Sequence, residues 1–84
     1  MTIAELHSKL KELEISENNY YLHGIYGSLD DSDKIALTIT KGKIGVEYEV
    51  YYKEKGEKQS AKTFLTEDEA CQYIYRQLSY GVSK

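Results

Sequence analysis

Residues Ile44–Lys53 read IGVEYEVYYK, the clearest alternation of apolar and polar side chains in this chain. Successive side chains of a β-strand point to opposite faces, so the pattern predicts a strand with one buried and one solvated face. The outward face is expected to carry Glu47, Glu49 and Tyr51. The inward face is expected to carry the apolar side chains of the other phase: Ile44, Val46, Tyr48, Val50 and Tyr52.

Three further strands are predicted around this one. The first covers about Tyr20–Tyr26, and the second begins near Ile35 and alternates up to Thr40. Gly42 then supplies a glycine where a tight hairpin requires a positive φ. A fourth strand is predicted at Gln59–Leu65, and its pattern does not settle which face is buried.

Two helices are predicted, one near each end of the chain. Thr2 and Glu5 form a capping-box pattern at the start of a helix over about Thr2–Glu14. Thr66 and Glu69 repeat this pattern before the second helix. Apolar residues at three- and four-residue spacing give each helix one buried stripe. The stripe of the second helix comprises Ala70, Cys71, Ile74 and Leu78. Gly81 follows it, and a glycine suits the C-terminus of a helix.

The element order α-β-β-β(β)-α predicts one α+β domain over residues 1–84, because a chain of this length cannot form two cores. Hairpin-length connections favour an antiparallel meander of three to four strands. Both helices are expected on one face of the sheet. The other face is expected to be open to solvent, with polar or functional side chains.

Composition limits the classes of partner. The 84 residues carry a formal charge of −3, which disfavours nucleic acid. The sequence has no apolar run near the roughly 20 residues that span a bilayer and no signal-peptide pattern. We therefore expect no membrane association and a cytoplasmic location. Cys71 is the single cysteine, which excludes an internal disulfide.

No set of side chains in the sequence predicts catalysis. His7 and His23 belong to different predicted elements, and neither has the spacing of a catalytic triad or a metal site. The acidic loop Asp30–Asp33 lacks the ligand ladder of a calcium loop. We therefore expect no metal, no cofactor and no enzymatic activity.

The acidic loop and the outward strand face together form a candidate contact surface. Tyrosine is enriched at protein interfaces, and the neighbouring carboxylates give the surface a negative charge. The alternative is that these residues only keep the surface soluble while the helices bind. The predicted partner-binding residues are Glu47, Glu49, Tyr51, Asp30, Asp31 and Asp33.

Three other functions fit parts of the pattern. The α-β-β-β-α order also describes the double-stranded-RNA-binding domain. That fold uses a lysine-rich first turn in its second helix, whereas Glu67, Asp68 and Glu69 would repel phosphates here. A small adaptor or a homo-oligomeric structural protein is the remaining alternative.

Residues Tyr48–Gly56 read YEVYYKEKG, and residues Phe64–Tyr73 read FLTEDEACQY. These runs resemble the patterns W-E-V-Y-Y-x-E-R-G and F-x-S/T-E-x-E-A-C of small bacterial immunity proteins encoded beside polymorphic toxins. The likeness covers about Tyr21–Leu78. This chain departs from the pattern with Tyr48 in place of Trp and Lys55 in place of Arg.

The resemblance implies that the chain binds one cognate toxin domain, often a nuclease or an NAD-consuming enzyme. Binding would neutralise the toxin by protein–protein interaction, as in contact-dependent growth inhibition. The free protein is then expected to be a monomer in the bacterial cytoplasm.

Overall fold

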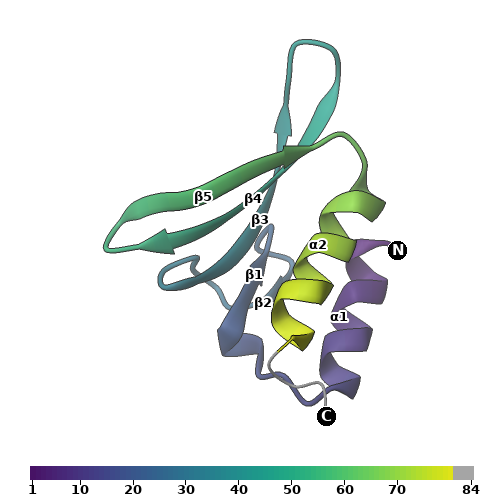
Figure 1. The fold of residues 1–84 in the computed structure, drawn as a ribbon, viewed down its shortest axis with the longest axis vertical. Helices are drawn as coiled ribbons and strands as arrows, with labels where there is room; N and C mark the ends of the chain where they lie inside the picture. Colours follow the sequence, from purple (N-terminus) through teal and green to yellow (C-terminus); the bar gives the residue numbers. More distant parts are fainter. Residues whose placement is uncertain (81–84) are drawn as a thin grey trace.

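The computed structural model describes residues 1–80 and contains two α-helices and a five-stranded sheet (Figure 1). The predicted α+β class is confirmed, and Gly81 lies outside the described residues. The elements follow in the order α1 (Ile3–Glu12), the 3-10 helix η1 (Glu17–Asn19), β1 (Tyr20–Leu22), β2 (Tyr26–Gly27), β3 (Lys34–Lys41), β4 (Val46–Glu54), β5 (Glu57–Phe64) and α2 (Glu67–Ser79).

Side-chain caps determine where both helices begin. The Thr2 hydroxyl accepts a hydrogen bond from the Glu5 N–H at 3.1 Å, and the Glu5 carboxylate accepts one from the Thr2 N–H at 2.8 Å. In α2 the Thr66 hydroxyl accepts the Glu69 N–H at 3.2 Å. These bonds satisfy N–H groups that have no partner within the first turn. Both predicted helix starts are therefore confirmed.

The sheet is mixed rather than antiparallel. Its strand order is β2-β1-β3-β4-β5, and β1 runs parallel to β3, with Tyr20 opposite Ile35 and Leu22 opposite Leu37. The other neighbouring strands are antiparallel. The predicted antiparallel meander of three to four strands is wrong in this respect. The element order also differs from the α-β-β-β-α order on which the RNA-binding alternative depended, because five strands lie between the two helices.

The parallel pairing follows from a turn inside the predicted strand Tyr20–Tyr26. His23 and Gly24 have φ values of 54° and 74°, which an extended strand does not contain. The chain reverses at this turn, and β2 returns antiparallel to β1. Residues 28–33 then carry the chain back, so that β3 starts beside the start of β1 and runs in the same direction.

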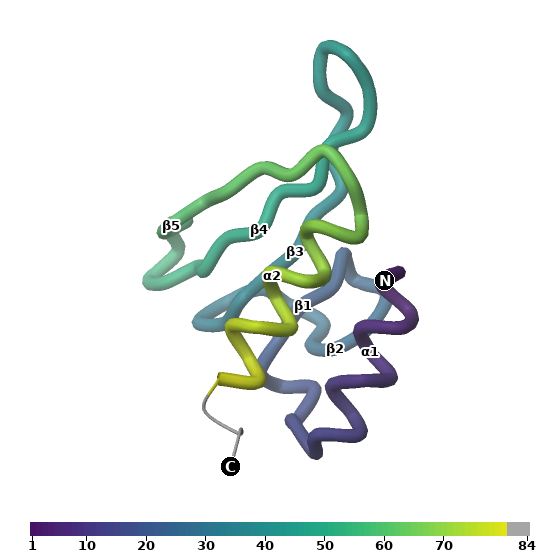
Figure 2. The backbone as a smooth tube through the Cα atoms, turned by 45° about the vertical axis from the view of Figure 1, so that its right-hand side comes forward, coloured from purple at the N-terminus to yellow at the C-terminus, as the bar shows by residue number. Residues whose placement is uncertain are grey.

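Both helices pack side by side on the same face of the sheet (Figure 1 and Figure 2). The hydrophobic core lies between the helices and this face, and it also includes Tyr20 at the start of β1. Removal of these apolar side chains from water is the main force that holds the two layers together. Its most completely buried side chains include Leu6, Leu10, Leu22, Leu37, Val50, Cys71 and Ile74.

Strand β4 follows the predicted burial only at its centre. Val50 is 1% exposed, but Ile44 and Val46 are 101% and 52% exposed, because the β3–β4 hairpin extends beyond the helices. Tyr52, which was predicted to be buried, is 42% exposed. Tyr51, which was predicted to face solvent, is 3% exposed. The burial prediction is therefore confirmed for Val50 and wrong for the other four residues, Ile44, Val46, Tyr51 and Tyr52.

A β-bulge opposite Tyr51 explains the exposure of its neighbour Tyr52. The register between β4 and β5 shifts between Val50 and Tyr52, so two residues of β5 lie opposite Tyr51. One of them, Ser60, has a φ of 53°. A bulge increases the local twist of a strand pair. The far end of the β4–β5 hairpin accordingly swings away from α2 (Figure 1), which leaves Tyr52 partly uncovered.

The chain reversal predicted at Gly42 is present in a different form. Lys41 pairs with Val46, and the Gly42 N–H donates to the Gly45 carbonyl at 2.7 Å. The glycines with positive φ in the described part of the chain lie elsewhere, including Gly56 in the β4–β5 turn. The prediction of a tight turn with positive φ at Gly42 is therefore wrong.

Candidate functional site

The helix-free face of the sheet is partly covered, because the loop of residues 28–33 lies against it. The Tyr51 hydroxyl donates a hydrogen bond to Asp31 Oδ2 at 2.6 Å. The Asp33 N–H donates to the Lys53 carbonyl at 2.6 Å, and Ser32 forms an isolated bridge with Lys53. Backbone and side-chain contacts thus dock the loop on β4. The prediction of an open face is wrong at this position.

Short polar side chains give the loop its shape. Ser28 Oγ accepts the Asp30 N–H at 3.4 Å, and Asp30 Oδ1 accepts the Ser32 N–H at 3.0 Å. Such bonds replace the backbone pairing that a strand would provide. Lys34 Nζ lies 3.2 Å from Asp30 Oδ1. The Ser32 N–H, followed by Lys34, lowers the pKa of the Asp30 carboxyl.

Alternating charges surround Tyr51. Lys53 Nζ lies 3.4 Å from Asp31 Oδ1, and Lys58 Nζ lies 2.9 Å from Glu49 Oε1. Lys58 Nζ also lies 4.6 Å from the centroid of the Tyr51 ring, within cation–π range. Lys53 and Lys58 are directly opposite each other across β4 and β5, so the two carboxylates offset a repulsion between the lysines. We call these five residues the Tyr51 network.

The protonation states of the Tyr51 network support one another. Burial, followed by the Asp31 carboxylate, raises the pKa of Tyr51, so its hydroxyl stays a donor at neutral pH. The same hydrogen bond, with a smaller effect of Lys53, lowers the pKa of Asp31. Asp31 therefore remains a charged acceptor to a lower pH than a free aspartate.

The structure brings half of the predicted contact residues together in this network. Tyr51 itself is almost completely buried, so its side chain offers no surface to a partner. Asp31 and Glu49 keep part of their side chains in solvent, 23% and 24% respectively. The network therefore presents two carboxylates, each paired with a lysine, and conceals the aromatic ring.

The other three predicted contact residues lie around the network. Glu47 is on the same face of β4, nearer the β3–β4 connection, and a Cβ placed on Gly42 would collide with its carboxylate. Asp30 is exposed in the loop, with 72% of its side chain in solvent. Asp33 is also exposed, and its carbonyl accepts the Tyr52 hydroxyl at 3.2 Å.

Lys53 and Lys58 are the network members that the sequence prediction missed. Alternation along β4 places Lys53 on the same face as Tyr51, so that signal was present in the sequence. The position of Lys58 depends on the register between β4 and β5. A bulge shifts this register, and the strand pattern alone does not reveal it.

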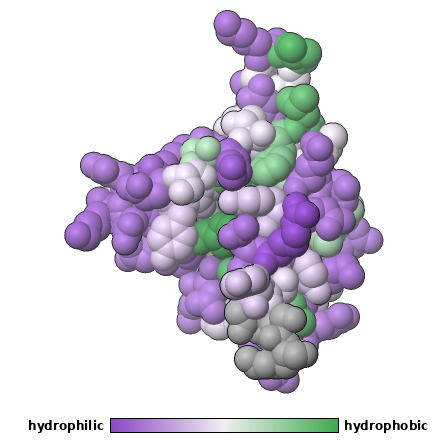
Figure 3. Space-filling model, in the orientation of Figure 1, coloured by the Kyte–Doolittle hydropathy of each residue, from purple (hydrophilic) through white to green (hydrophobic). Residues whose placement is uncertain are grey.

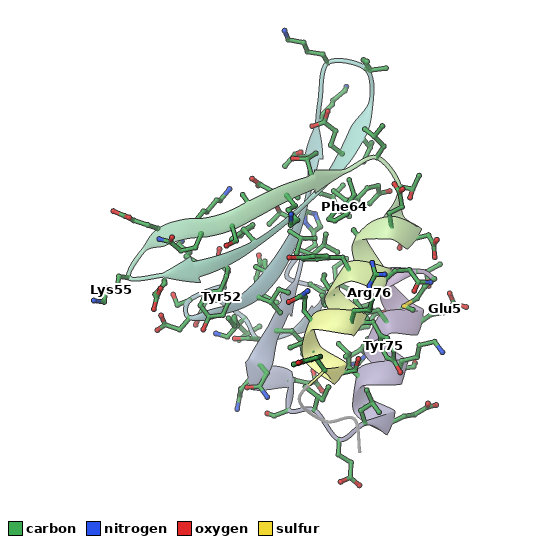
Figure 4. The ribbon with its side chains drawn as sticks, viewed as in Figure 1. Glu5, Tyr52, Lys55, Phe64, Tyr75 and Arg76 are labelled. Atoms are coloured by element: carbon green, nitrogen blue, oxygen red, sulfur yellow. The ribbon has the colours of Figure 1, made fainter. Side chains whose placement is uncertain are left out.

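A groove lies on the opposite face of the sheet, between the β4–β5 hairpin and α2. Two hollows of about 200 Å³ and 370 Å³ share Ile35, Tyr52 and Gln77 in their walls. Tyr73 of α2 lines the smaller hollow. Figure 4 shows Tyr52 on the hairpin, apart from the side chains of α2. The groove exists because the hairpin swings away from the helix.

The histidines and the cysteine occupy structural positions. His7 stacks on Tyr26, with ring centroids 4.4 Å apart, and His23 Nδ1 accepts the Ile39 N–H at 3.1 Å beside the end of β1. Cys71 is buried, and burial raises its pKa to about 12. In the part of the chain that the structure describes, no three His, Cys, Asp or Glu side chains gather as a metal site would require.

Comparison with known proteins found no match among family models, curated proteins or solved structures. Among the described residues, no helix combines the length and the apolar content needed to cross a membrane. The Tyr51 network and the uncovered surfaces are therefore the structural basis for assigning a function.

Proposed function

We propose that this chain is a cytoplasmic immunity protein that binds and neutralises one cognate toxin domain of a polymorphic toxin system. The resemblance of Tyr48–Gly56 and Phe64–Tyr73 to such proteins motivates the proposal. The toxin domain is a nuclease or an NAD-consuming enzyme, and the chain acts on it by protein–protein interaction. A small adaptor for another class of protein is the alternative.

The observation that carries the proposal is the fixed position of the carboxylates around Tyr51. Asp31 is held by the Tyr51 hydroxyl at 2.6 Å, and Glu49 is held by Lys58 at 2.9 Å. Side chains that are ordered before binding lose little conformational entropy when a partner arrives. These carboxylates can therefore contribute their charge to binding without a large ordering cost.

Tyr51 acts as a positioning residue for this contact face. Because it is 3% exposed, a partner can touch only the groups that it holds in place. Its hydroxyl orients Asp31, and its ring lies under Lys58. The proposed contact residues are the acidic side chains that keep exposed surface: Glu47, Glu49, Asp30, Asp31 and Asp33.

Charge makes a basic cleft the matching surface on the toxin. Nuclease domains bind a polyanionic substrate, and an acidic protein can occupy the same basic positions through complementary charge. The chain carries a formal charge of −3, which adds to the local charge of the contact face. Such complementarity increases the association rate, and the increase diminishes as salt screens the charges.

The neighbouring upstream reading frame supplies the first test. A large secreted protein with a toxin-like C-terminal domain is the expected partner, and its absence would favour the adaptor alternative. Co-expression should protect a bacterial host from that domain, and isothermal titration calorimetry should detect a direct complex. An encoded toxin domain that neither binds the chain nor loses toxicity would refute the immunity proposal.

Charge reversal tests the placement of the contact. Glu47→Lys combined with Glu49→Lys should weaken binding at low salt by about 100-fold and slow association. Glu12→Lys combined with Glu14→Lys changes the net charge equally at the end of α1, and it should leave the Kd within about threefold. Unchanged binding by the first variant at low salt would show that another surface makes the contact.

A further inference from the structure

The β3–β4 hairpin projects from the body of the molecule and holds apolar side chains in solvent. It is the segment at the top of Figure 1, beyond both helices. Ile44 is 101% exposed and Val46 is 52% exposed. Figure 3 shows apolar surface along this projection, in the view that also faces the helices. The apolar side chains on the helix-facing side of β4 therefore continue past the end of the core, at Val46 and then Ile44.

The apolar side chains are uncovered because the helices stop short of them. Tyr48 pairs with Phe64, and both are partly buried against the core. Helix α2 begins at Glu67, shortly after β5 ends, and it runs away from the hairpin (Figure 1). The face of β4 beyond Tyr48 thus has neither helix over it. We call the apolar side chains of this face, together with the Tyr48–Phe64 pair at its border with the core, the hairpin stripe: Ile44, Val46, Tyr48 and Phe64.

Opposite charges lie at the two ends of the hairpin stripe. The tip carries Lys41 and Lys43, and both residues are exposed. At the other end, the first turn of α2 carries three carboxylates. Two of them are bonded to the terminal amine and to a backbone N–H at the start of the chain, and Glu69 is exposed. The stripe therefore runs from a basic tip through apolar side chains to an acidic helix start.

We infer that the hairpin stripe is a self-association surface whose partner is a second copy of this chain. A twofold axis through the middle of the stripe sets the two hairpins antiparallel and face to face. Each basic tip then meets the acidic start of α2 in the other copy, and Ile44 and Val46 of the two copies bury one another. A twofold interface must be complementary to itself. The order basic, apolar, acidic meets that requirement.

The shape of the molecule favours the same arrangement. The hairpin extends beyond the start of α2, so the backbone is offset between the hairpin and the helix start (Figure 1 and Figure 2). Two molecules with this offset can fit together about a twofold axis, so that each hairpin covers the exposed Ile44 of the other. Pairing through the edge strand β5 is less suitable, because the bulge at Ser60 and the charges of Lys58 and Lys62 protect that edge.

The size of the hairpin stripe sets the strength of the dimer. Stable specific interfaces bury about 1,200 Å² or more in total, whereas the hairpin stripe has only two largely exposed apolar side chains, Ile44 and Val46. We therefore expect a weak, reversible dimer that dissociates on dilution. This inference does not depend on the proposed toxin binding, because the contact face of the Tyr51 network lies on the other side of the sheet.

Sedimentation velocity of the full chain over about 5 to 500 μM measures this association. We expect a monomer–dimer equilibrium with a Kd of about 10 to 200 μM at low salt, weakened in about 0.5 M salt. Ile44→Ser combined with Val46→Ser should raise the Kd by about 30-fold or more. A monomer over the whole range, or a dimer that persists in this variant, would overturn the inference.

A matched control removes two exposed apolar side chains elsewhere. Ile25 is 61% exposed and Leu29 is 93% exposed, and both lie outside the hairpin stripe. Ile25→Ser combined with Leu29→Ser should leave the Kd within about twofold. If these control substitutions weaken the dimer as strongly as the hairpin substitutions do, the inference is overturned. Exposed apolar side chains in general would then cause the association.

Charge exchange tests the antiparallel arrangement. Lys43→Glu and Glu69→Lys each place like charges together, and each should raise the Kd by about five- to tenfold. The double variant carries both charges in exchanged positions, so its Kd should return to within about threefold of the original. Circular dichroism checks that each variant is folded. A double variant as weak as the two single variants would refute the proposed twofold contact.

Discussion

The hydrogen bond from Tyr51 to Asp31 allows a direct test of how the loop of residues 28–33 is held on the helix-free face of the sheet. Tyr51→Phe removes only the hydroxyl and keeps the ring beneath Lys58. A hydrogen bond to a charged acceptor contributes about 1.5–3 kcal/mol. Because the Asp31 side chain is 23% exposed, water replaces part of this bond, and we expect a loss of about 1–2 kcal/mol. The melting temperature should fall by roughly 5–15 °C.

The effect of Tyr51→Phe should depend on pH in a direction set by both partners. The pKa of Asp31 is lowered in the folded protein, so its stabilisation is complete above the ordinary pKa of 3.8 and is lost as pH falls through the folded value. The pKa of Tyr51 is raised, so its stabilisation is present below the ordinary pKa of 10 and is lost as pH rises through the folded value. The variant and the original should therefore differ most between about pH 5 and pH 9.

Urea unfolding of a double-mutant cycle measures this interaction. The cycle combines Tyr51→Phe with Asp31→Asn at pH 7 and at about pH 2.5. We expect a coupling energy of about 1 kcal/mol or more at pH 7 and a smaller one in acid. Tyr80→Phe, at an 87% exposed residue, is the control and should change nothing. A coupling below about 0.3 kcal/mol at pH 7, or one that does not vary with pH, would refute the reasoning.

Three further predictions concern local backbone and core features. A methyl group on Gly27 would collide with the Tyr20 backbone at a φ of 83°, so Gly27→Ala should cost more than about 2 kcal/mol in urea unfolding. Gly45 faces open space, so Gly45→Ala should cost less than about 0.5 kcal/mol, and equal losses would contradict the steric argument. His23→Ala removes the acceptor of the Ile39 N–H, which water can replace in part because His23 is exposed, and should cost about 0.5–1.5 kcal/mol; hydrogen exchange at Ile39 should accelerate, and an unchanged rate would argue against this role. The buried Cys71 thiol, with its pKa raised to about 12, should react with a thiol reagent at neutral pH only as fast as the protein opens, so rapid labelling of the folded protein would be inconsistent with the structure.

Local signals predicted the helices and much of the strand content. The pairs Thr2 with Glu5 and Thr66 with Glu69 act within one turn, so sequence spacing is sufficient to locate them. The turn at His23 was not predicted. A positive φ is uncommon for a non-glycine residue, and a histidine inside a strand-like pattern does not by itself indicate one. That one turn converted a predicted antiparallel strand into a parallel partner of β3.

The sequence predicted that the acidic loop and the outward face of the strand share one surface, but it did not predict the individual contacts that join them. Asp31 and Tyr51 are separated by 20 positions, and their contact depends on a loop that crosses the sheet. Lys58 joins them through a register that the bulge shifts. Long-range contacts of this kind have no counterpart in local spacing, so the sequence prediction listed the carboxylates but not the lysines that hold them.

The sequence by itself determined the alternation of Ile44–Lys53 and therefore which of its side chains share a face, because the period of a strand is a property of the backbone. Only the tertiary structure decided which of them are buried. The helices cover Val50 but end before Val46, the loop of residues 28–33 docks against Tyr51, and the bulged hairpin leaves Tyr52 in solvent. Burial depends on what lies over a face, and distant parts of the chain supply that cover.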